Sequence, residues 1–193
     1  ERVKILFNSG AKDSVNQIIE IRPLPQVNFY VDNVCKGETA MFQDNSSIAS
    51  GAIAQYLWDF NNDGIADETG LVASFNLGDS GTYEATLECI SENGCKSSTT
   101  KKNQVFDKPA AGFTASNTSL GENTAFTNTT TVADGIISIS LWDFGDSVTS
   151  TLPDPLHKYS AAGTYKVRLI SVSDKNCRDT IDNEVTILFL FNG

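Results

Sequence analysis

Trp142-Asp143-Phe144-Gly145-Asp146, followed downstream by Gly163-Thr164-Tyr165, is the stretch that decides the fold of this chain. The same elements, Trp58-Asp59-Phe60 and Gly81-Thr82-Tyr83, occur in the same order 84 and 82 residues earlier. Self-similarity at a fixed period indicates tandem copies of one structural unit. We therefore predict that the chain of 193 residues contains two copies of one repeat.

The repeat boundaries are predicted from the positions of prolines, because proline resists continuing a strand ladder. Pro109 separates a first repeat at residues 25–107 from a second repeat at residues 108–193. Residues 1–24 resemble the end of the same unit, since they contain a similar pair of apolar, alternating segments. We expect residues 1–24 to be the last two strands of an upstream copy.

Alternating side chains predict short, half-buried strands within each repeat. Tyr165, Val167 and Leu169 fall on one face, whereas Lys166 and Arg168 fall on the other. A period of two is typical of a strand with one buried face. Many such strands, separated by turn residues, predict an all-β fold of tandem two-sheet sandwiches with one tryptophan in each core. A tyrosine directly after Gly-Thr also suits a tyrosine corner.

Composition excludes several classes of function. The chain has 14 basic and 24 acidic residues, a net charge of −10 and a pI of about 4.4. Nucleic-acid binding depends on a basic surface, so we predict no nucleic-acid partner. No window approaches the roughly 18 apolar residues of a membrane span, so we predict no membrane insertion. The single histidine excludes a histidine-rich metal site.

Three motifs of the second repeat together resemble the polycystic kidney disease (PKD) domain. They are Trp142-Asp143-Phe144-Gly145-Asp146, Pro155-Leu156-His157-Lys158-Tyr159 and Gly163-Thr164-Tyr165-Lys166-Val167. In the first repeat Phe75 and Leu77 replace the histidine and tyrosine, so the similarity is looser there. The resemblance implies an immunoglobulin-like sandwich and an extracellular, non-catalytic module that serves as spacer, adhesion unit or accessory binding domain.

The cysteines refine this resemblance. Cys35-Lys36-Gly37-Glu38 together with Asn93-Gly94-Cys95 resembles the PKD variety of large surface adhesins of gliding bacteria, exported by the type IX system. That resemblance implies a Cys35–Cys95 disulfide, a cell-surface location, and neighbouring repeats, surface polysaccharide or protein as partners. A Cys89–Cys95 bridge is the alternative pairing. Ser119 replaces Cys35 in the second repeat, so Cys177 is expected to have no partner within its own repeat.

One loop has the spacing of a calcium site. Asp59, Asn61, Asp63 and Asp67 provide oxygen ligands at positions 1, 3, 5 and 9, and Gly64 stands at position 6. Calcium prefers such oxygen ligands, but position 12 lacks the bidentate glutamate. The alternative is a turn in which Asn and Asp accept hydrogen bonds from nearby backbone amides. No other cofactor is predicted.

Three hydroxyl residues match an Asp-Ser/Thr-apolar pattern that resembles the O-glycan acceptor on surface proteins of gliding bacteria. They are Ser14, Ser147 and Thr180. The alternative is a common turn-to-strand tripeptide without modification, and the measured mass of the intact protein would distinguish the two.

The sequence favours binding or structural functions over catalysis. His157 has Phe75 at its place in the first repeat, which indicates a packing role. No nucleophile elbow, zinc-protease motif or phosphate loop is present. The leading hypothesis is a structural spacer or adhesion array of a large bacterial surface protein. The alternative is an accessory module of a secreted hydrolase that binds polysaccharide or protein.

Overall fold

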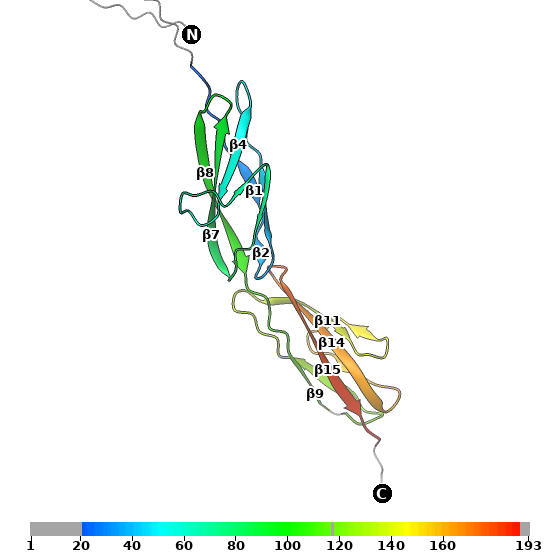
Figure 1. The fold of residues 1–193 in the computed structure, drawn as a ribbon. Helices are drawn as coiled ribbons and strands as arrows, with labels where there is room; N and C mark the ends of the chain where they lie inside the picture. Colours follow the sequence, from blue (N-terminus) through cyan, green and yellow to red (C-terminus); the bar gives the residue numbers. More distant parts are fainter. Residues whose placement is uncertain (1–20, 117, 190–193) are drawn as a thin grey trace, which may run out of the picture. The chain divides into compact units, whose positions relative to one another are not determined.

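The computed structural model describes residues 21–116 and 118–189, and these residues form strands and loops without any helix. Figure 1 shows the chain as two groups of strands that follow one another in sequence. The two strands expected near the N-terminus fall mostly on residues 1–20, which lie outside the described residues. None of the described segments is a helix that could cross a membrane.

The first repeat forms two sheets of three and five strands, ordered β1-β3-β6 and β2-β8-β7-β4-β5. Its strands are β1 (Phe29–Val31), β2 (Val34–Cys35), β3 (Ala40–Asp44), β4 (Ile53–Asp59), β5 (Glu68–Thr69), β6 (Val72–Phe75), β7 (Gly81–Ser91) and β8 (Lys96–Phe106). The short β2 runs parallel to the end of β8, whereas β1, β5 and β7 pair antiparallel with their neighbours β3 and β4.

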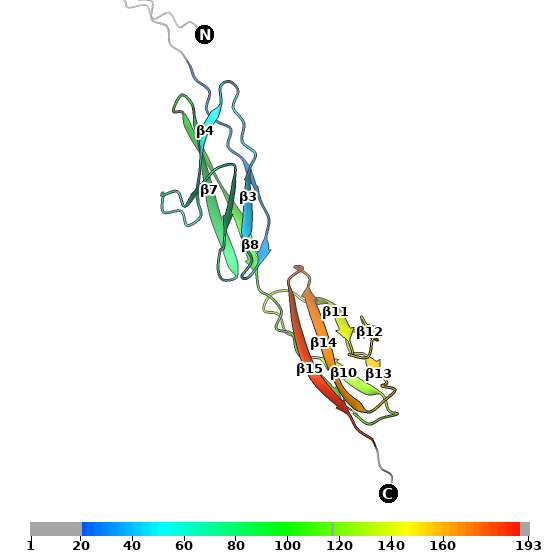
Figure 2. The same ribbon diagram turned by 45° about the vertical axis from the view of Figure 1, so that its right-hand side comes forward.

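The second repeat also forms two sheets, ordered β13-β10-β9 and β12-β11-β14-β15. Figure 2 labels strands of both sheets. Its strands are β9 (Phe113–Ser116), β10 (Thr124–Asn128), β11 (Ile137–Asp143), β12 (Thr149–Ser150), β13 (Leu156–His157), β14 (Gly163–Ser173) and β15 (Arg178–Ile187). An isolated parallel bridge between Ser119 and Leu188 takes the place of the β2–β8 pairing.

Within each of the two repeats, equivalent residues face each other across the same pair of strands. Trp58 on β4 is opposite Leu87 on β7, and Trp142 on β11 is opposite Leu169 on β14. Both tryptophan strands carry an irregularity in the ladder near their start. The tandem all-β sandwich predicted from the sequence is therefore confirmed.

Each repeat is organised around four aromatic rings at equivalent positions. These are Phe29, Phe42, Trp58 and Phe60 in the first repeat, and Phe113, Phe126, Trp142 and Phe144 in the second. The edge of one ring faces the next at nearly the same geometry, 5.1 Å and 81° for Phe29–Trp58 against 5.2 Å and 72° for Phe113–Trp142. Such edge-to-face pairs stabilise beyond the area that they bury. The second core cluster contains only residues of its own repeat.

In each repeat, the indole N–H of the buried tryptophan donates a hydrogen bond to a backbone carbonyl. The Trp58 indole N–H donates to the Gly70 carbonyl at 2.8 Å, and that of Trp142 donates to the Leu152 carbonyl at 2.9 Å. A buried donor without a partner would cost about 1–3 kcal/mol. These bonds attach the loop after the tryptophan strand to the core.

The predicted tyrosine corner is present in the second repeat. The Tyr165 hydroxyl donates to the Ala161 carbonyl at 2.9 Å. The neighbouring Tyr159 is buried and donates to the Phe144 carbonyl at 3.1 Å. Burial raises the pKa of the Tyr159 hydroxyl, with a smaller contribution from the carboxylate of Asp146.

Backbone proximity groups the described residues into two compact units. The first consists of residues 21–32, Met41–Phe75 and Tyr83–Asn103, and the second of Asn33–Ala40, Asn76–Thr82 and residues 104–189. The second unit therefore includes three segments whose sequence belongs to the first repeat, Asn33–Ala40, Asn76–Thr82 and residues 104–107. One of these segments contains Cys35, which is important for the cysteine pairing described below.

Candidate functional site

The four residues of the predicted calcium loop lie at the end of β4 and in the loop that leads to β5. Asp59 is the last residue of β4, Asp67 directly precedes β5, and Asn61 and Asp63 are exposed in between. Gly64 adopts a φ of 84°, a left-handed conformation that glycine accommodates without strain. The loop thus brings the expected side chains into one short segment.

Most carboxylate oxygens of this loop accept backbone N–H groups. Asp59 Oδ1 accepts from Asn61 and Asn62, and Asp59 Oδ2 accepts from Gly64 at 2.8 Å. Asp67 Oδ2 accepts from the Phe60 amide at 2.7 Å. These bonds are the ones that the Asx-turn alternative describes, because the acidic side chains satisfy amides that the turn leaves unpaired.

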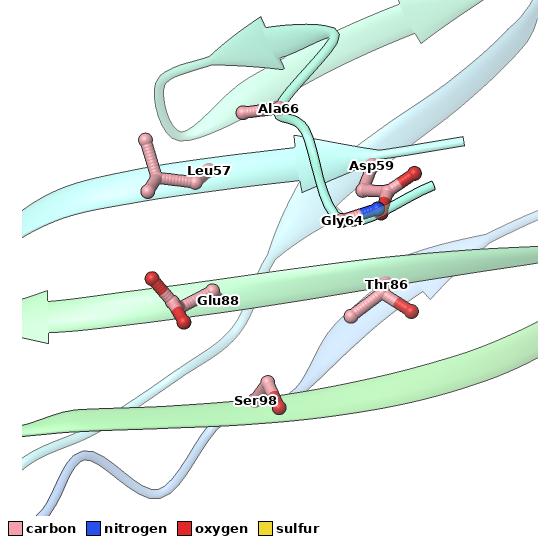
Figure 3. Close-up of a pocket in the computed structure, with 7 residues that line it drawn as sticks. All are labelled: Leu57, Asp59, Gly64, Ala66, Thr86, Glu88 and Ser98. Atoms are coloured by element: carbon pink, nitrogen blue, oxygen red, sulfur yellow. The ribbon is translucent and has the colours of Figure 1, made fainter. Parts of the chain in front are cut away.

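A shallow hollow of about 160 Å³ borders this loop. Figure 3 shows its lining, in which Asp59 and Gly64 lie together above the outer face of the sheet. The other lining residues are Leu57, Ala66, Thr86, Glu88 and Ser98. Binding pockets for small organic ligands measure about 300–1,000 Å³, so this hollow has room for water or a small ion rather than a sugar chain.

The donor chemistry of the loop suits calcium in type, since every candidate ligand is a carboxylate or amide oxygen. Within residues 21–116 and 118–189, however, no three side chains of His, Cys, Asp or Glu are grouped as a metal site requires. The calcium site at Asp59, Asn61, Asp63 and Asp67 therefore stays a prediction.

The equivalent loop of the second repeat is shorter and is closed by His157. The His157 ring stacks on Phe144 at 4.2 Å and 4°, and meets Tyr159 edge-on at 4.4 Å. Its Nε2 lies 2.8 Å from Asp146 Oδ2. In the first repeat Phe75 stacks on Phe60 in the same way, at 4.7 Å and 19°. His157 thus packs as a core ring with one polar contact to the loop.

A larger hollow, of about 370 Å³, lies on the outer face of the second repeat. It is lined by residues of β11, β12 and β14. Leu141, Trp142 and Ile170 are its apolar residues, and Arg168 is one of its polar residues. Leu141 is 40% exposed and the nearby Ile139 47% exposed. This volume reaches the range of small-ligand sites.

A carboxylate paired with two basic side chains lies at the same face. Asp182 on β15 accepts from Arg168 Nε at 2.7 Å and Nη2 at 3.0 Å, and Lys166 Nζ lies 2.9 Å away. Hydrogen bonds from Arg168, and then from Lys166, hold the pKa of the Asp182 carboxyl well below its usual range. This pairing fixes the direction of Arg168 beside the hollow.

The predicted glycan acceptors lie at the surface where the structure describes them. Ser147 is exposed in the loop between β11 and β12 with a φ of 72°, and Thr180 is exposed on β15. Ser14 lies outside the described residues. Modification at these three positions stays a prediction.

The structure places the disulfide elsewhere than expected. Cys35 is bonded to Cys177, with their Cα atoms 5.6 Å apart, and Cys95 is a free thiol. The Cys35–Cys95 pairing is therefore wrong for this structure, because Cys35 ends β2 at the edge of its sheet, whereas Cys95 lies in the turn between β7 and β8. The alternative Cys89–Cys95 bridge is also absent, since both thiols are free.

Cys177 has no partner within its own repeat, as expected, but it does have one in the first repeat. Cys89 is fully buried on β7, and burial raises the pKa of its thiol. A buried thiol of this kind behaves as a small apolar side chain rather than as a reactive group.

The family of the chain follows from the comparison of its sequence with known protein families. The PKD domain model matches residues 22–106 and 107–187. The chain belongs to the PKD domain family. Both matched segments are PKD domains, which are non-catalytic modules.

Curated relatives match a PKD portion of much longer proteins. Collagenase ColQ1 of Bacillus cereus (strain Q1) is 46% identical over 54 residues, which cover 28% of this chain and 6% of that protein. The microbial collagenase of Vibrio alginolyticus is 38% identical over 82 residues, covering 41% of this chain and 10% of that protein. The chain thus spans a tenth or less of these relatives.

Solved PKD domains are similar to a single repeat. The PKD1 domain of the Vibrio cholerae metalloprotease PrtV is 27% identical and covers 44% of this chain and 98% of that domain, with a TM-score of 0.35. The PKD1 domain of Vibrio anguillarum Epp is 24% identical, with coverage of 44% and 96% and a TM-score of 0.39.

Sequence reasoning missed the Cys35–Cys177 bridge and the hollow beside Arg168. The family resemblance implies a cysteine pair within one repeat, whereas this bridge joins residues of two repeats. A signal did exist, since Ser119 at the place of Cys35 left Cys177 without a partner in its own repeat. The hollow had no such signal, because it depends on how the short β12 covers β11.

Proposed function

We propose that this chain is a structural spacer segment of a large bacterial surface protein, exported to the cell exterior and acting as part of a repeat array. The observation that carries the proposal is the near-identity of the two aromatic cores, at equal sequence spacing and almost equal ring geometry. A repeat with its own core can be added to a chain without remodelling its neighbours. The adhesin of a gliding bacterium is the setting that we favour.

Surface charge supports a spacer. Exposed lysines pair with carboxylates on the outer strands, as in Lys96–Glu88 and Lys102–Glu84. Pairs of this kind contribute little to stability and cancel each other's charge, whereas the net charge of −10 keeps neighbouring copies apart. A disulfide further supports an oxidising compartment outside the cytoplasm.

The second candidate is an accessory module that binds the substrate of a secreted hydrolase. It is favoured by the hollow of about 370 Å³ beside Leu141 and Arg168, and by relatives that are collagenases. Trp142 lines this hollow but is only 2% exposed, and Trp58 is fully buried, so neither forms a flat tryptophan platform.

Binding of the intact chain to collagen fibrils and to insoluble polysaccharides tests the two candidates. A spacer is expected to give no more retention than an unrelated acidic protein, whereas an accessory module gives saturable retention. The variant Leu141→Asn should then abolish retention, and Leu57→Asn, at the equivalent place in the first repeat, should not. Saturable binding lost in Leu141→Asn alone would replace the spacer by the accessory module.

A further inference from the structure

The disulfide links two points that are far apart along the chain. Cys35 and Cys177 are separated by 142 residues. The closed loop contains all strands from β3 to β14, including Trp58 and Trp142. Outside the loop lie β1, β2 up to its last residue, and β15.

Both cysteines are held in ordered surroundings within the second compact unit. Cys35 is 8% exposed, and its backbone N–H donates to Glu38 Oε2 at 3.1 Å. The next amide, of Lys36, donates to the Phe106 carbonyl at 2.8 Å. These bonds attach the end of β2 to the end of β8 and fix the direction of the Cys35 side chain.

The partner cysteine lies in the tight turn between β14 and β15. Cys177 is fully buried, and its carbonyl accepts from the Ser173 amide at 2.8 Å. Asn176 adopts a φ of 63°, which turns the chain so that Cys177 follows directly. Nearby, Lys175 Nζ lies 5.9 Å from the centre of the Phe106 ring. The bridge is thus built into two hydrogen-bonded turns rather than into loose loops.

We propose that the Cys35–Cys177 disulfide is a covalent bypass for tension applied along the chain. Force that enters through the N-terminal residues reaches Cys35 and crosses the two sulfur atoms to Cys177. It then leaves through β15. The residues inside the loop cannot be extended by this force, so the strands from β3 to β14 are protected from being pulled out straight. Phe29 on β1 and Ile187 on β15 lie outside the loop, so these two strands stay in the line of force.

This inference gives the proposed spacer a mechanical role, and in that respect it rests on the proposed function. Only connectivity matters for it, because a closed loop cannot extend however its parts are arranged. An unfolded loop of 142 residues would otherwise lengthen the chain by about 500 Å, at 3.3–3.6 Å per residue. While the disulfide is intact, this extension does not occur when the chain is pulled.

Single-molecule pulling of the full chain, through cysteine-free handles at both termini, tests the proposal. In the oxidised chain we expect extension from the end segments only. After reduction with dithiothreitol, the total extension should increase by about 500 Å. The variant Cys177→Ser should show the long extension without reductant, and its circular dichroism checks that the repeats are still folded.

The double variant Cys89→Ala/Cys95→Ser is the matched control, because it removes both free thiols and leaves the bridge intact. It should behave like the unmodified chain. A bridge between Cys35 and Cys95 would hide only 60 residues, about 200 Å, and would be lost in the control rather than in Cys177→Ser. That pattern, or equal extension with and without reductant, would overturn the bypass. The binding assays of the proposed function do not depend on the bridge, so the two can fail separately.

Discussion

At the scale of single residues, Trp142 holds the second core together. It contacts Phe113, Phe126 and Phe144, and its indole N–H donates a hydrogen bond to the Leu152 carbonyl. Replacing a fully buried large side chain by alanine costs about 3–5 kcal/mol. We expect Trp142→Ala to lower the free energy of unfolding of the second repeat by this amount, measured by denaturant titration. Leu152→Ala is the control, because that side chain is 61% exposed and should change stability by less than about 0.5 kcal/mol.

The carboxylate of Asp182 makes stability depend on pH in a defined direction. Hydrogen bonds from Arg168 and Lys166 lower its pKa in the folded chain. A group with a lowered folded pKa stabilises above its unfolded pKa, about 3.9, and loses this contribution as the pH falls toward the folded value. Asp182→Asn should therefore lower the Tm at pH 7, and the difference from the unmodified chain should shrink as the pH falls below about 4.

Thermal unfolding followed by circular dichroism at several pH values measures this effect. Glu184→Gln removes an exposed carboxylate from the same strand and is the matched control. It should leave the dependence of Tm on pH the same as in the unmodified chain. A Tm difference for Asp182→Asn that stays constant from pH 7 to pH 2 would contradict the pairing.

At the scale of elements, the turn after β11 depends on one glycine. Gly145 has a φ of 79°, and a Cβ at this residue would lie 2.7 Å from the Lys166 carbonyl oxygen. Left-handed backbone costs other residues about 1–2 kcal/mol, and the contact with a strand carbonyl adds to this cost. Gly145→Ala should thus destabilise the second repeat more than Gly121→Ala, whose φ is 93° but whose Cβ would meet open space. Equal losses in the two variants would show that contact with β14 is unimportant.

The loop between β4 and β5 depends on Asp59. Its carboxylate accepts three backbone N–H groups, so Asp59→Ala should cost the first repeat about 1–3 kcal/mol. Asp63→Ala, which removes an acceptor for the Ile65 amide, should cost less. Denaturant titration followed by tryptophan fluorescence measures both, and a larger loss for Asp63→Ala would contradict this account of the loop.

Calcium titration distinguishes the two hypotheses for the same loop. Under the calcium hypothesis, a concentration 100 times the Kd stabilises the first repeat by about 2.7 kcal/mol, and Asp67→Asn weakens the response. Under the Asx-turn hypothesis the Tm is unchanged by calcium. Magnesium at the same concentration controls for ionic strength.

The sequence was sufficient to predict those elements whose formation depends on local pattern. The alternation from Tyr165 to Leu169 predicted β14, and the repeated Trp-Asp-Phe predicted one core per repeat. The pairing of Cys35 was not predictable, because a disulfide depends on which turns meet in space and not on spacing along the chain. For the same reason, the direction of the Asp59 carboxylate toward backbone amides could be offered only as one of two alternatives.

At the scale of the whole molecule, each core should sustain folding by itself. The cluster around Trp142 consists of residues between Phe113 and Ile187, and among the described strands β9 to β15 pair only with one another. A fragment of residues 107–189 should therefore fold alone, with a free energy of unfolding of about 4–12 kcal/mol by its size. Denaturant titration should give one cooperative transition, and Cys177→Ser in this fragment should leave it unchanged, because Cys35 is absent. A broad, non-cooperative transition would show instead that the second repeat depends on segment 33–40, which the second compact unit also contains.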